Sequence, residues 1–222
     1  MISRNDQHVY HDQSGSKWLS VTQQLTIAGF CDFSMVSPAN LEHARIRGYF
    51  VHETVKLLVY DNLDTEIDSL DPGYRNYVKA FVQFQKDHGW AVFKTEEIVF
   101  DNSLRTCGEY DQIGKLRNSD VLLLLDIKAT ATVSEAVRLQ TAAYRDFYNQ
   151  DPRNKQKVGL RGSLQLLPSG KYKLYFYKDA QDIRIFQCIC KSNWWSLSNK
   201  IIPLGAKSSD STYKLCKQII GG

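Results

Sequence analysis

The sequence of 222 residues predicts an α/β fold, and two features carry that prediction. Residues 121–125, Val-Leu-Leu-Leu-Leu, are apolar on both faces of an extended chain, which is the pattern of a central strand. Segments with the periodicity of amphipathic helices lie on either side, at residues 41–60 and 133–148. We therefore expect a β-sheet with helices packed against it.

The first third of the chain is predicted to be mainly helical. Residues 1–17 are polar and indicate an irregular arm. Ser20 or Thr22 is expected to cap a short helix that runs through Ile27 towards Gly29, and a later helix begins near Tyr74 and ends near Gly89. Between them, the helix over residues 41–60 carries one stripe of apolar and small residues and a histidine: Leu41, Ala44, Gly48, His52, Val55 and Val59.

His52 therefore faces inward on its predicted helix. An inward histidine on an apolar stripe is more often a hydrogen-bonded core residue than a metal ligand. Gly48 lies one turn earlier on the same stripe, where a missing side chain would let the helix approach the sheet closely. This spacing favours the ligand interpretation, and the core interpretation stays open beside it.

The middle of the chain predicts a meander of strands. Residues 96–100 turn at residues 101–103 into a strand over residues 105–116, and the polar residues 117–120 form a hairpin loop to the central strand. If Leu116 pairs with Val121, Asp111 lies opposite Asp126, and Glu109 lies opposite Lys128. Asp126 and Lys128 are two residues apart and share one face of the sheet.

Directly opposed carboxylates destabilise a sheet unless a cation or a proton compensates them. A divalent metal such as Mg²⁺ or Mn²⁺ meets that need, because hard ions take carboxylate oxygens as ligands. The alternative is an exposed hairpin with acids on its solvent face. That alternative fits poorly, since Leu122 and Leu124 share the face of Asp126.

The remaining elements follow the central strand. On the helix over residues 133–148, Ala136, Leu139, Ala143 and Phe147 form the buried face, while Gln140 and Tyr144 lie together on the flank. Residues 163–167 and 172–177 form a hairpin, and residues 182–195 form a closing helix. We expect residues 18–205 to form a single domain and residues 206–222 a flexible basic tail.

The charge distribution is asymmetric. Residues 153–222 hold 13 Lys and Arg against 3 Asp and Glu, whereas residues 1–152 hold 15 against 21. A basic region beside an acidic metal centre suits a phosphodiester substrate, although solubility alone also explains a lysine-rich end. Arg153, Lys155, Lys157 and Arg161 follow the helix of Gln140 and Tyr144, and we expect them to bind the substrate strand.

Other function classes are disfavoured. The five cysteines contain no Cys-x-x-Cys pair, so neither a disulfide framework nor a zinc ribbon is indicated. No apolar stretch approaches the ~20 residues that cross a bilayer, and the N-terminus lacks the apolar region of a signal peptide. We expect no membrane partner and a cytoplasmic location.

Taken in order, four motifs resemble the RecB-like branch of the PD-(D/E)XK nuclease superfamily: His52, Gly108-x-x-Asp111, Asp126-x-Lys128 and Gln140-x-x-x-Tyr144. The opening Ser20-Val21-Thr22 is also similar to phage-encoded members and to the mitochondrial genome-maintenance exonuclease. One departure is Ala129, where a threonine is frequent. The missing Cys-x-x-Cys elements put the iron-sulfur subgroup in doubt.

This resemblance implies a restriction-endonuclease-like core, in which a central mixed β-sheet is flanked by α-helices. It also implies hydrolysis of DNA, with His52, Asp111, Asp126 and the Ile127 carbonyl holding Mg²⁺ or Mn²⁺. Lys128 would assist the reaction, and Gln140 and Tyr144 would position the strand. An exonuclease is the first expectation and an endonuclease the second, with an inactive DNA- or protein-binding module as the alternative class. For a phage-encoded member, the expected location is the host cytoplasm.

Overall fold

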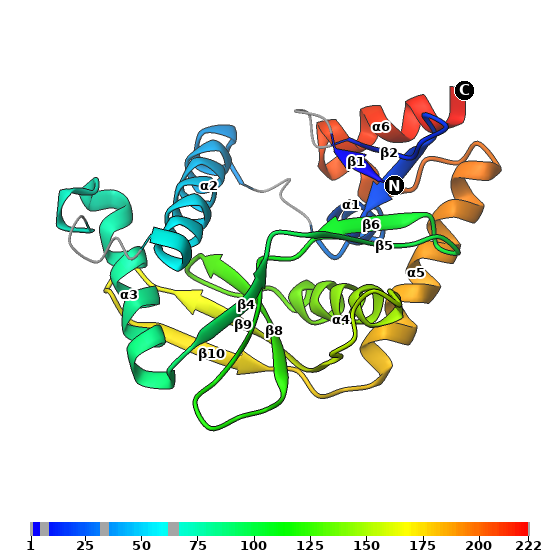
Figure 1. Ribbon diagram of the computed structural model, residues 1–222. Coiled ribbons are helices and arrows are strands. Elements are labelled where there is room, and N and C mark those ends of the chain that lie inside the picture. The colour runs from blue at the N-terminus through cyan, green and yellow to red at the C-terminus, as the bar shows by residue number, and fades with distance from the viewer. Residues whose placement is uncertain (1, 5–8, 32–35, 62–66, 222) are drawn as a thin grey trace.

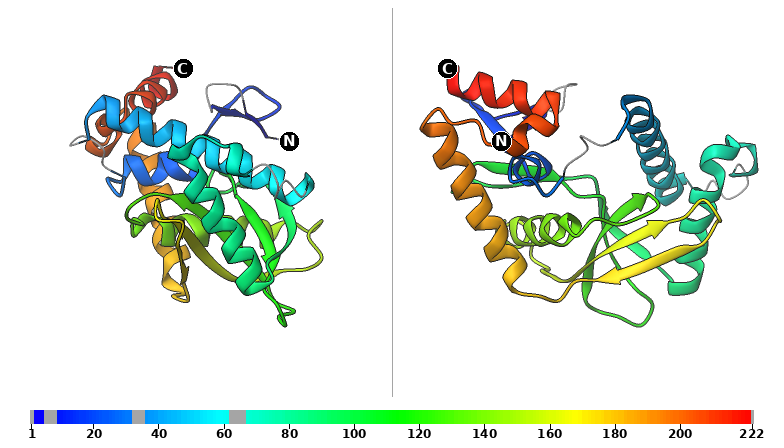
Figure 2. Two further views of the ribbon diagram at one scale, coloured as in Figure 1. Left: turned by 90° about the vertical axis from the view of Figure 1, so that its left-hand side faces the viewer. Right: turned by 180° about the vertical axis from the view of Figure 1, so that it is seen from behind.

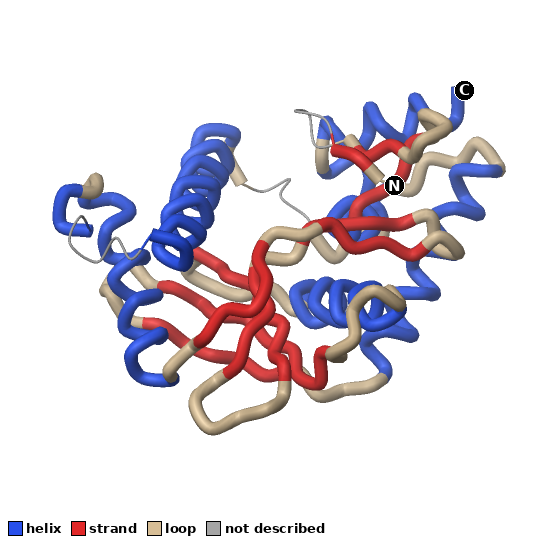
Figure 3. Tube along the Cα trace, in the orientation of Figure 1, coloured by secondary structure: helices blue, strands red, loops and turns tan. Residues whose placement is uncertain are grey.

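A computed structural model of the protein describes residues 2–4, 9–31, 36–61 and 67–221. The described strands form two five-stranded sheets, in the orders β1-β2-β3-β6-β5 and β10-β9-β8-β7-β4 (Figure 1). Helices flank both sheets, as the colouring by secondary structure shows (Figure 3). The predicted α/β class is therefore confirmed.

The first sheet contains β1 (Ser3–Arg4), β2 (Tyr10–His11), β3 (Lys17–Ser20), β5 (Ile98–Asp101) and β6 (Thr106–Glu109). The second sheet contains β4 (Ala91–Thr95), β7 (Gln112–Lys115), β8 (Leu122–Ala129), β9 (Val158–Leu166) and β10 (Tyr172–Phe176). The helices are α1 (Val21–Ile27), α2 (Pro38–Asp61), α3 (Pro72–His88), α4 (Ala136–Gln150), α5 (Gln181–Ser198) and α6 (Asp210–Gly221). Short 3₁₀ helices lie at Ile67–Ser69 and Leu204–Ser208.

Both sheets are mixed. β3 is parallel to β6 and β8 is parallel to β9, while the other described pairs are antiparallel. The central strand of the second sheet is β8, the leucine-rich run that the sequence predicts. Because parallel neighbours need a crossover connection, α4 lies between β8 and β9 in the chain.

The two faces of β8 enter two different cores. Leu122 and Leu124 pack in the cluster that contains α4, whereas Leu123 and Leu125 pack against α2 and α3. Helix α4 also contacts β5 of the other sheet, so it lies between the two sheets (Figure 2). Asp126 follows the alternation and shares the face of Leu122 and Leu124, as predicted.

The chain passes from one sheet to the other at Tyr110 and Asp111. The predicted continuous strand over residues 105–116 is therefore wrong, because β6 pairs with β5 and β7 pairs with β8. Glu109 pairs with Ile98 rather than lying opposite Lys128, which corrects that expectation as well. The hairpin register itself is confirmed, since Gln112 faces Leu125 one position before the predicted Asp111–Asp126 level.

Local sequence signals explain several helix boundaries. Ser20 caps α1 by accepting a hydrogen bond from the Gln23 backbone, and the Gln23 side chain accepts from the Ser20 backbone in return. Helix α3 ends at Gly89, whose φ of 56° is left-handed and suits glycine. Strand β4 is not predicted from the sequence. Among the described residues, no helix is long and apolar enough to cross a bilayer.

Both ends of the chain differ from expectation. The arm before residue 18 is not wholly irregular, because the described part contains β1, β2 and the start of β3. The flexible basic tail is also wrong: Leu204–Ser208 and α6 are helical, and Leu215 and Cys216 of α6 are buried beside α1 and α5. Because the segment is rich in Lys and Ser, its composition alone does not reveal the apolar face of α6.

The packing of α6 yields a prediction for stability. Leu215 is 3% exposed, so Leu215→Ala should lower the free energy of unfolding by about 2 to 5 kcal/mol in urea titrations. The exposed Lys217→Ala on the same helix is the control and should stay within about 0.5 kcal/mol of wild type. Equal stability of the two variants would contradict a docked C-terminal helix.

Candidate functional site

Four side chains from three segments of the chain meet at the C-terminal end of β8. Asp126 and Lys128 lie on β8, Asp111 lies at the passage between the sheets, and His52 reaches over from α2. His52 Nδ1 is 3.4 Å from Asp111 Oδ1, and Lys128 Nζ is 2.8 Å from Asp126 Oδ2. The structure therefore brings together the four charged or ionisable residues that the motifs predict.

Asp111 is fixed by both its side chain and its backbone. Asp111 Oδ2 accepts a hydrogen bond from the backbone N–H of Ile127 at 2.6 Å. The Asp111 carbonyl accepts from the Glu96 backbone at 3.1 Å and from the Thr95 hydroxyl at 3.0 Å. The carboxylate is thus held at the end of the β7–β8 ladder although its residue has left the sheet.

Asp126 is almost fully enclosed, at 1% exposure. Lys128 Nζ donates a hydrogen bond to Asp126 Oδ1 at 3.0 Å. Oδ2 lies 2.8 Å from the same nitrogen, yet it accepts no hydrogen bond of regular geometry among the described residues. A buried carboxylate oxygen without a regular hydrogen bond is costly, and it can serve as a ligand for a cation.

The pKa values of this cluster are displaced in opposite directions. Burial, together with the negative charge of Asp111, raises the pKa of Asp126 to about 6, although Lys128 opposes the rise. Burial also acts on Asp111, but the charge and hydrogen bond of His52 lower its pKa below the usual range. The pKa values of His52 and Lys128 are raised because the nearby carboxylates outweigh the effect of burial. Displacements of this kind are typical of functional sites.

Gln140 and Tyr144 lie together on α4, as predicted. Gln140 Nε2 donates a hydrogen bond to the Tyr144 hydroxyl at 3.2 Å, and Tyr144 is 5% exposed. The Tyr144 ring packs on Gly108 of β6, where an added Cβ would lie 2.5 Å from the ring atom Cε1. The glycine of the Gly108-x-x-Asp111 motif is therefore required by the close approach of Tyr144.

Helix α2, which carries His52, is held by an ion pair and not by the close approach predicted at Gly48. An added Cβ at Gly48 would meet nothing within 4 Å, so the expectation that Gly48 lets the helix approach the sheet is wrong. Instead, Lys56 of α2 forms an ion pair with Glu96 in the turn before β5. These two residues have no sequence signal, because they lie far apart in the chain.

The donor set has the chemistry of a divalent metal site. Carboxylate oxygens and an imidazole suit Mg²⁺ and especially Mn²⁺, and Asp126 Oδ2 has no regular hydrogen bond. The Ile127 carbonyl points to the same side of β8 as its N–H, which is the side of Asp111. Within the described residues, no three His, Cys, Asp or Glu side chains already converge in positions that could hold a metal ion. The two carboxylates instead turn to His52 and Lys128.

Arg161 does not lie on the surface. Its side chain is 1% exposed and forms an ion pair with Asp182 of α5. It also donates hydrogen bonds to the Arg138 carbonyl at 2.7 Å and to the Thr141 hydroxyl at 3.2 Å. The prediction that Arg161 binds a DNA strand is therefore wrong. Its guanidinium group instead links α4 to α5 inside the protein.

The loop between α4 and β9 carries the other basic residues predicted to bind DNA: Arg153, Lys155 and Lys157. β9 runs parallel to β8 and starts with Val158 beside Leu122. Asp126 lies four residues further along β8, ~13 Å away at 3.3 Å per residue. The loop is therefore at the opposite end of β8 from Asp126, and its binding of a DNA strand stays a prediction.

Comparisons with known proteins support the architecture. No family model and no curated protein matches the sequence. A protein from Eubacterium rectale, named "Putative exonuclease" in its crystal structure, is similar with a TM-score of 0.51 at 10% identity, over 87% of this chain and 83% of that chain. An alkaline exonuclease from Laribacter hongkongensis gives a TM-score of 0.33 at 10% identity, over 82% of this chain and 92% of that chain. The first likeness bears on the fold alone, and the restriction-endonuclease-like fold is confirmed.

The displaced pKa of Asp126 predicts how stability varies with pH. Folding raises the pKa of the Asp126 carboxyl from 3.8 to about 6. The protonated carboxyl therefore stabilises the folded state below pH 4, and this stabilisation is lost as the pH rises through 6. Asp126→Asn keeps the neutral shape, so above pH 7 it should be more stable than wild type by up to about 3 kcal/mol. Urea titrations should show the difference vanish near pH 4. A variant less stable than wild type at pH 8 would contradict the burial cost.

The two glycines predict opposite effects of the same substitution. Gly108→Ala should displace the Tyr144 ring and lower the free energy of unfolding by about 1 to 3 kcal/mol. Gly48→Ala adds a methyl group in open space within α2 and should raise it by about 0.5 to 1 kcal/mol. Thermal unfolding of both variants measures this, and a tolerated alanine at position 108 would argue against the close contact.

Proposed function

We propose that this protein is a nuclease of the RecB-like branch that hydrolyses DNA phosphodiester bonds with Mg²⁺ or Mn²⁺ and acts from strand ends. One observation carries the proposal. Asp111 and Asp126, from two separate segments, lie beside His52 and Lys128 at the end of the central strand, and the charge of Asp111 helps to raise the pKa of Asp126.

Asp111, Asp126, His52 and the Ile127 carbonyl would hold the ion. The chemistry that a bound divalent ion supplies is activation of a water and neutralisation of charge on the phosphoryl oxygens. Asp126, with a pKa of about 6, is mostly ionised at neutral pH and is available as a ligand. Binding needs a rotation of the carboxylates away from Lys128 and His52, which are their present partners.

Lys128 has an electrostatic role in this proposal. Its pKa is raised by Asp126 and Asp111, so the side chain is a protonated ammonium group at neutral pH while it pairs with Asp126. With Asp126 engaged as a metal ligand, the ammonium group of Lys128 would be free to stabilise negative charge on the phosphoryl oxygens. The amide of Gln140 and the hydroxyl of Tyr144, which are hydrogen-bonded to each other on α4, would orient the strand.

The exonuclease form is preferred to the endonuclease form. The resemblance to the RecB-like branch supports it, because members of that branch often degrade DNA from its ends, and so does the name of the similar protein from Eubacterium rectale. A binding module without activity is the alternative, and the complete set of two acids and a lysine argues against it. DNA is the proposed partner, since a metal and a lysine together suit a phosphodiester.

Cleavage of end-labelled linear DNA tests the proposal. With Mg²⁺ or Mn²⁺, the wild type should shorten linear strands and leave closed circles intact, and EDTA should abolish the reaction. Asp126→Asn should lower the rate by at least about 100-fold, because it removes a carboxylate ligand. Asp120→Asn makes the same change in an exposed loop at the other end of β8 and should retain activity.

Each contrary outcome has a clear meaning. Full activity in EDTA, or equal rates for the two variants, would exclude the proposed metal chemistry at Asp126. Cleavage of closed circles would assign the endonuclease form. Inactivity of the wild type on single- and double-stranded DNA, with Mn²⁺ still raising the melting temperature, would favour the binding module.

A further inference from the structure

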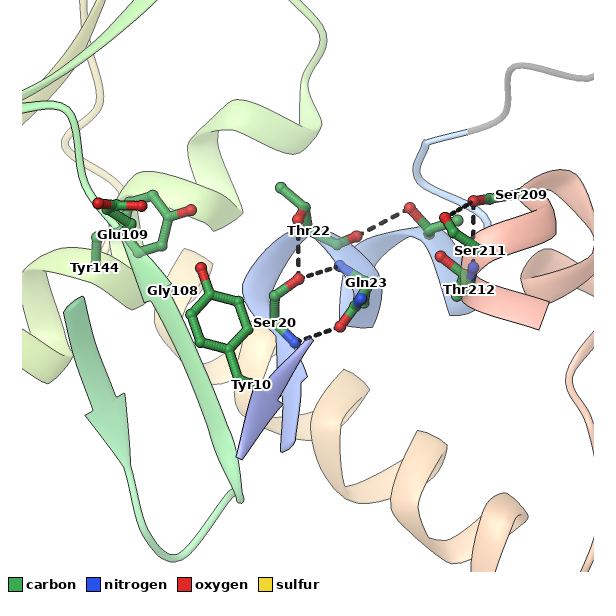
Figure 4. A pocket seen from close by; sticks show the side chains of 11 residues that line it. Tyr10, Ser20, Thr22, Gln23, Gly108, Glu109, Tyr144, Ser209, Ser211 and Thr212 are labelled. Atoms are coloured by element: carbon green, nitrogen blue, oxygen red, sulfur yellow. Dashed lines mark hydrogen bonds between the residues drawn. The ribbon is translucent and has the colours of Figure 1, made fainter. Parts of the chain in front are cut away.

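A cavity of about 390 Å³ opens beside Tyr144, and its lining contains none of the four residues of the charged cluster around Asp126. Its walls come from both the N-terminal strands and the C-terminal helix as well as from α1, β6 and α4. Figure 4 shows Tyr10, Tyr144 and Glu109 on one side, residues of α1 in the middle, and Ser209, Ser211 and Thr212 on the other side. A volume in this range is large enough for a small organic ligand, since such sites span about 300 to 1,000 Å³.

The chemistry of the lining favours a neutral ligand over an anion. Serine, threonine and tyrosine hydroxyls dominate it, and none of its described lining residues is a lysine or an arginine. Glu109 adds a carboxylate, which repels a phosphate. Hydroxyl groups both donate and accept hydrogen bonds, so they suit a neutral group with several donors and acceptors. The sugar and base of a nucleoside have that character.

The cavity adjoins the proposed catalytic cluster through two residues. Tyr144 lines the cavity, and its hydroxyl accepts the hydrogen bond from Gln140. Glu109 lies two residues before Asp111, and two residues of chain span at most ~7 Å. A strand whose phosphate lies at Asp111 and Asp126 therefore has the cavity within reach of a neighbouring nucleoside.

We propose that this cavity binds the sugar and base of the nucleotide next to the cleaved phosphate. The inference rests on the proposed nuclease function for the position of the phosphate, and on the lining for the class of ligand. The hydroxyls of Tyr10, Tyr144 and the serine and threonine residues of the lining would hydrogen-bond the polar groups of the sugar and base. The docking of α6 then has a role, because α6 supplies one wall of the cavity.

Saturation-transfer NMR of deoxythymidine with the full chain measures nucleoside binding directly and needs no DNA cleavage. The probe should bind the wild type at millimolar concentration. Ser211→Phe fills the cavity from an exposed position and should weaken binding at least tenfold. Ser192→Phe makes the same change at an exposed position on α5, outside the cavity lining, and should leave binding unchanged.

Inorganic phosphate is the second probe and should neither bind the cavity nor compete with deoxythymidine. No binding of the nucleoside to the wild type, equal binding to Ser211→Phe, or displacement by phosphate would overturn the inference. Asp126→Asn should bind deoxythymidine like the wild type. If the protein cleaves no DNA but the NMR results are as expected, the nuclease function fails while the nucleoside site stands. Active protein that binds no nucleoside would overturn the nucleoside site and leave the nuclease function intact.

Discussion

The hydrogen bond from the Ile127 backbone to Asp111 Oδ2 is the contact on which the site depends. The β7–β8 ladder ends where Gln112 faces Leu125, and beyond it the chain of Asp111 has left the sheet. The side chain of Asp111 takes the place of the missing backbone partner at the next position. This contact ties the passage between the two sheets to β8, so that Asp111 and Asp126 lie together whenever the hairpin is in register.

Burial makes that proximity costly. Two carboxylates share an enclosed corner, and the Lys128 ammonium compensates Asp126 only in part, since the pKa of Asp126 is still raised to about 6. Hydrophobic packing elsewhere offsets this cost: β8 fills two cores with alternating leucines, and α4 is enclosed between two sheets. A buried cluster that lowers stability is typical of a site kept for function.

The sequence predicts the parts of the fold that have strong local signals, such as the leucine-rich strand, the capping of α1 and the amphipathic helix α4. The hairpin register follows from a short loop, which explains why the sequence predicts the β7–β8 register correctly and, with it, that Asp111 lies close to Asp126. Three features depend on tertiary partners and differ from the prediction: the bend at Tyr110, the burial of Arg161 and the docking of α6. From the sequence alone, Arg161 is expected at the surface. Its burial depends on Asp182 of α5, which supplies the opposite charge.

A crystal structure of the protein soaked with Mn²⁺, with anomalous diffraction data, tests the central claim most directly. The account predicts an anomalous peak between Asp111 and Asp126 at coordination distances of roughly 2.0 to 2.3 Å from their oxygens. It also predicts that Lys128 loses its hydrogen bond to Asp126. An ion bound elsewhere, or an Asp126–Lys128 pair unchanged at saturating Mn²⁺, would contradict the claim that these carboxylates form a metal centre.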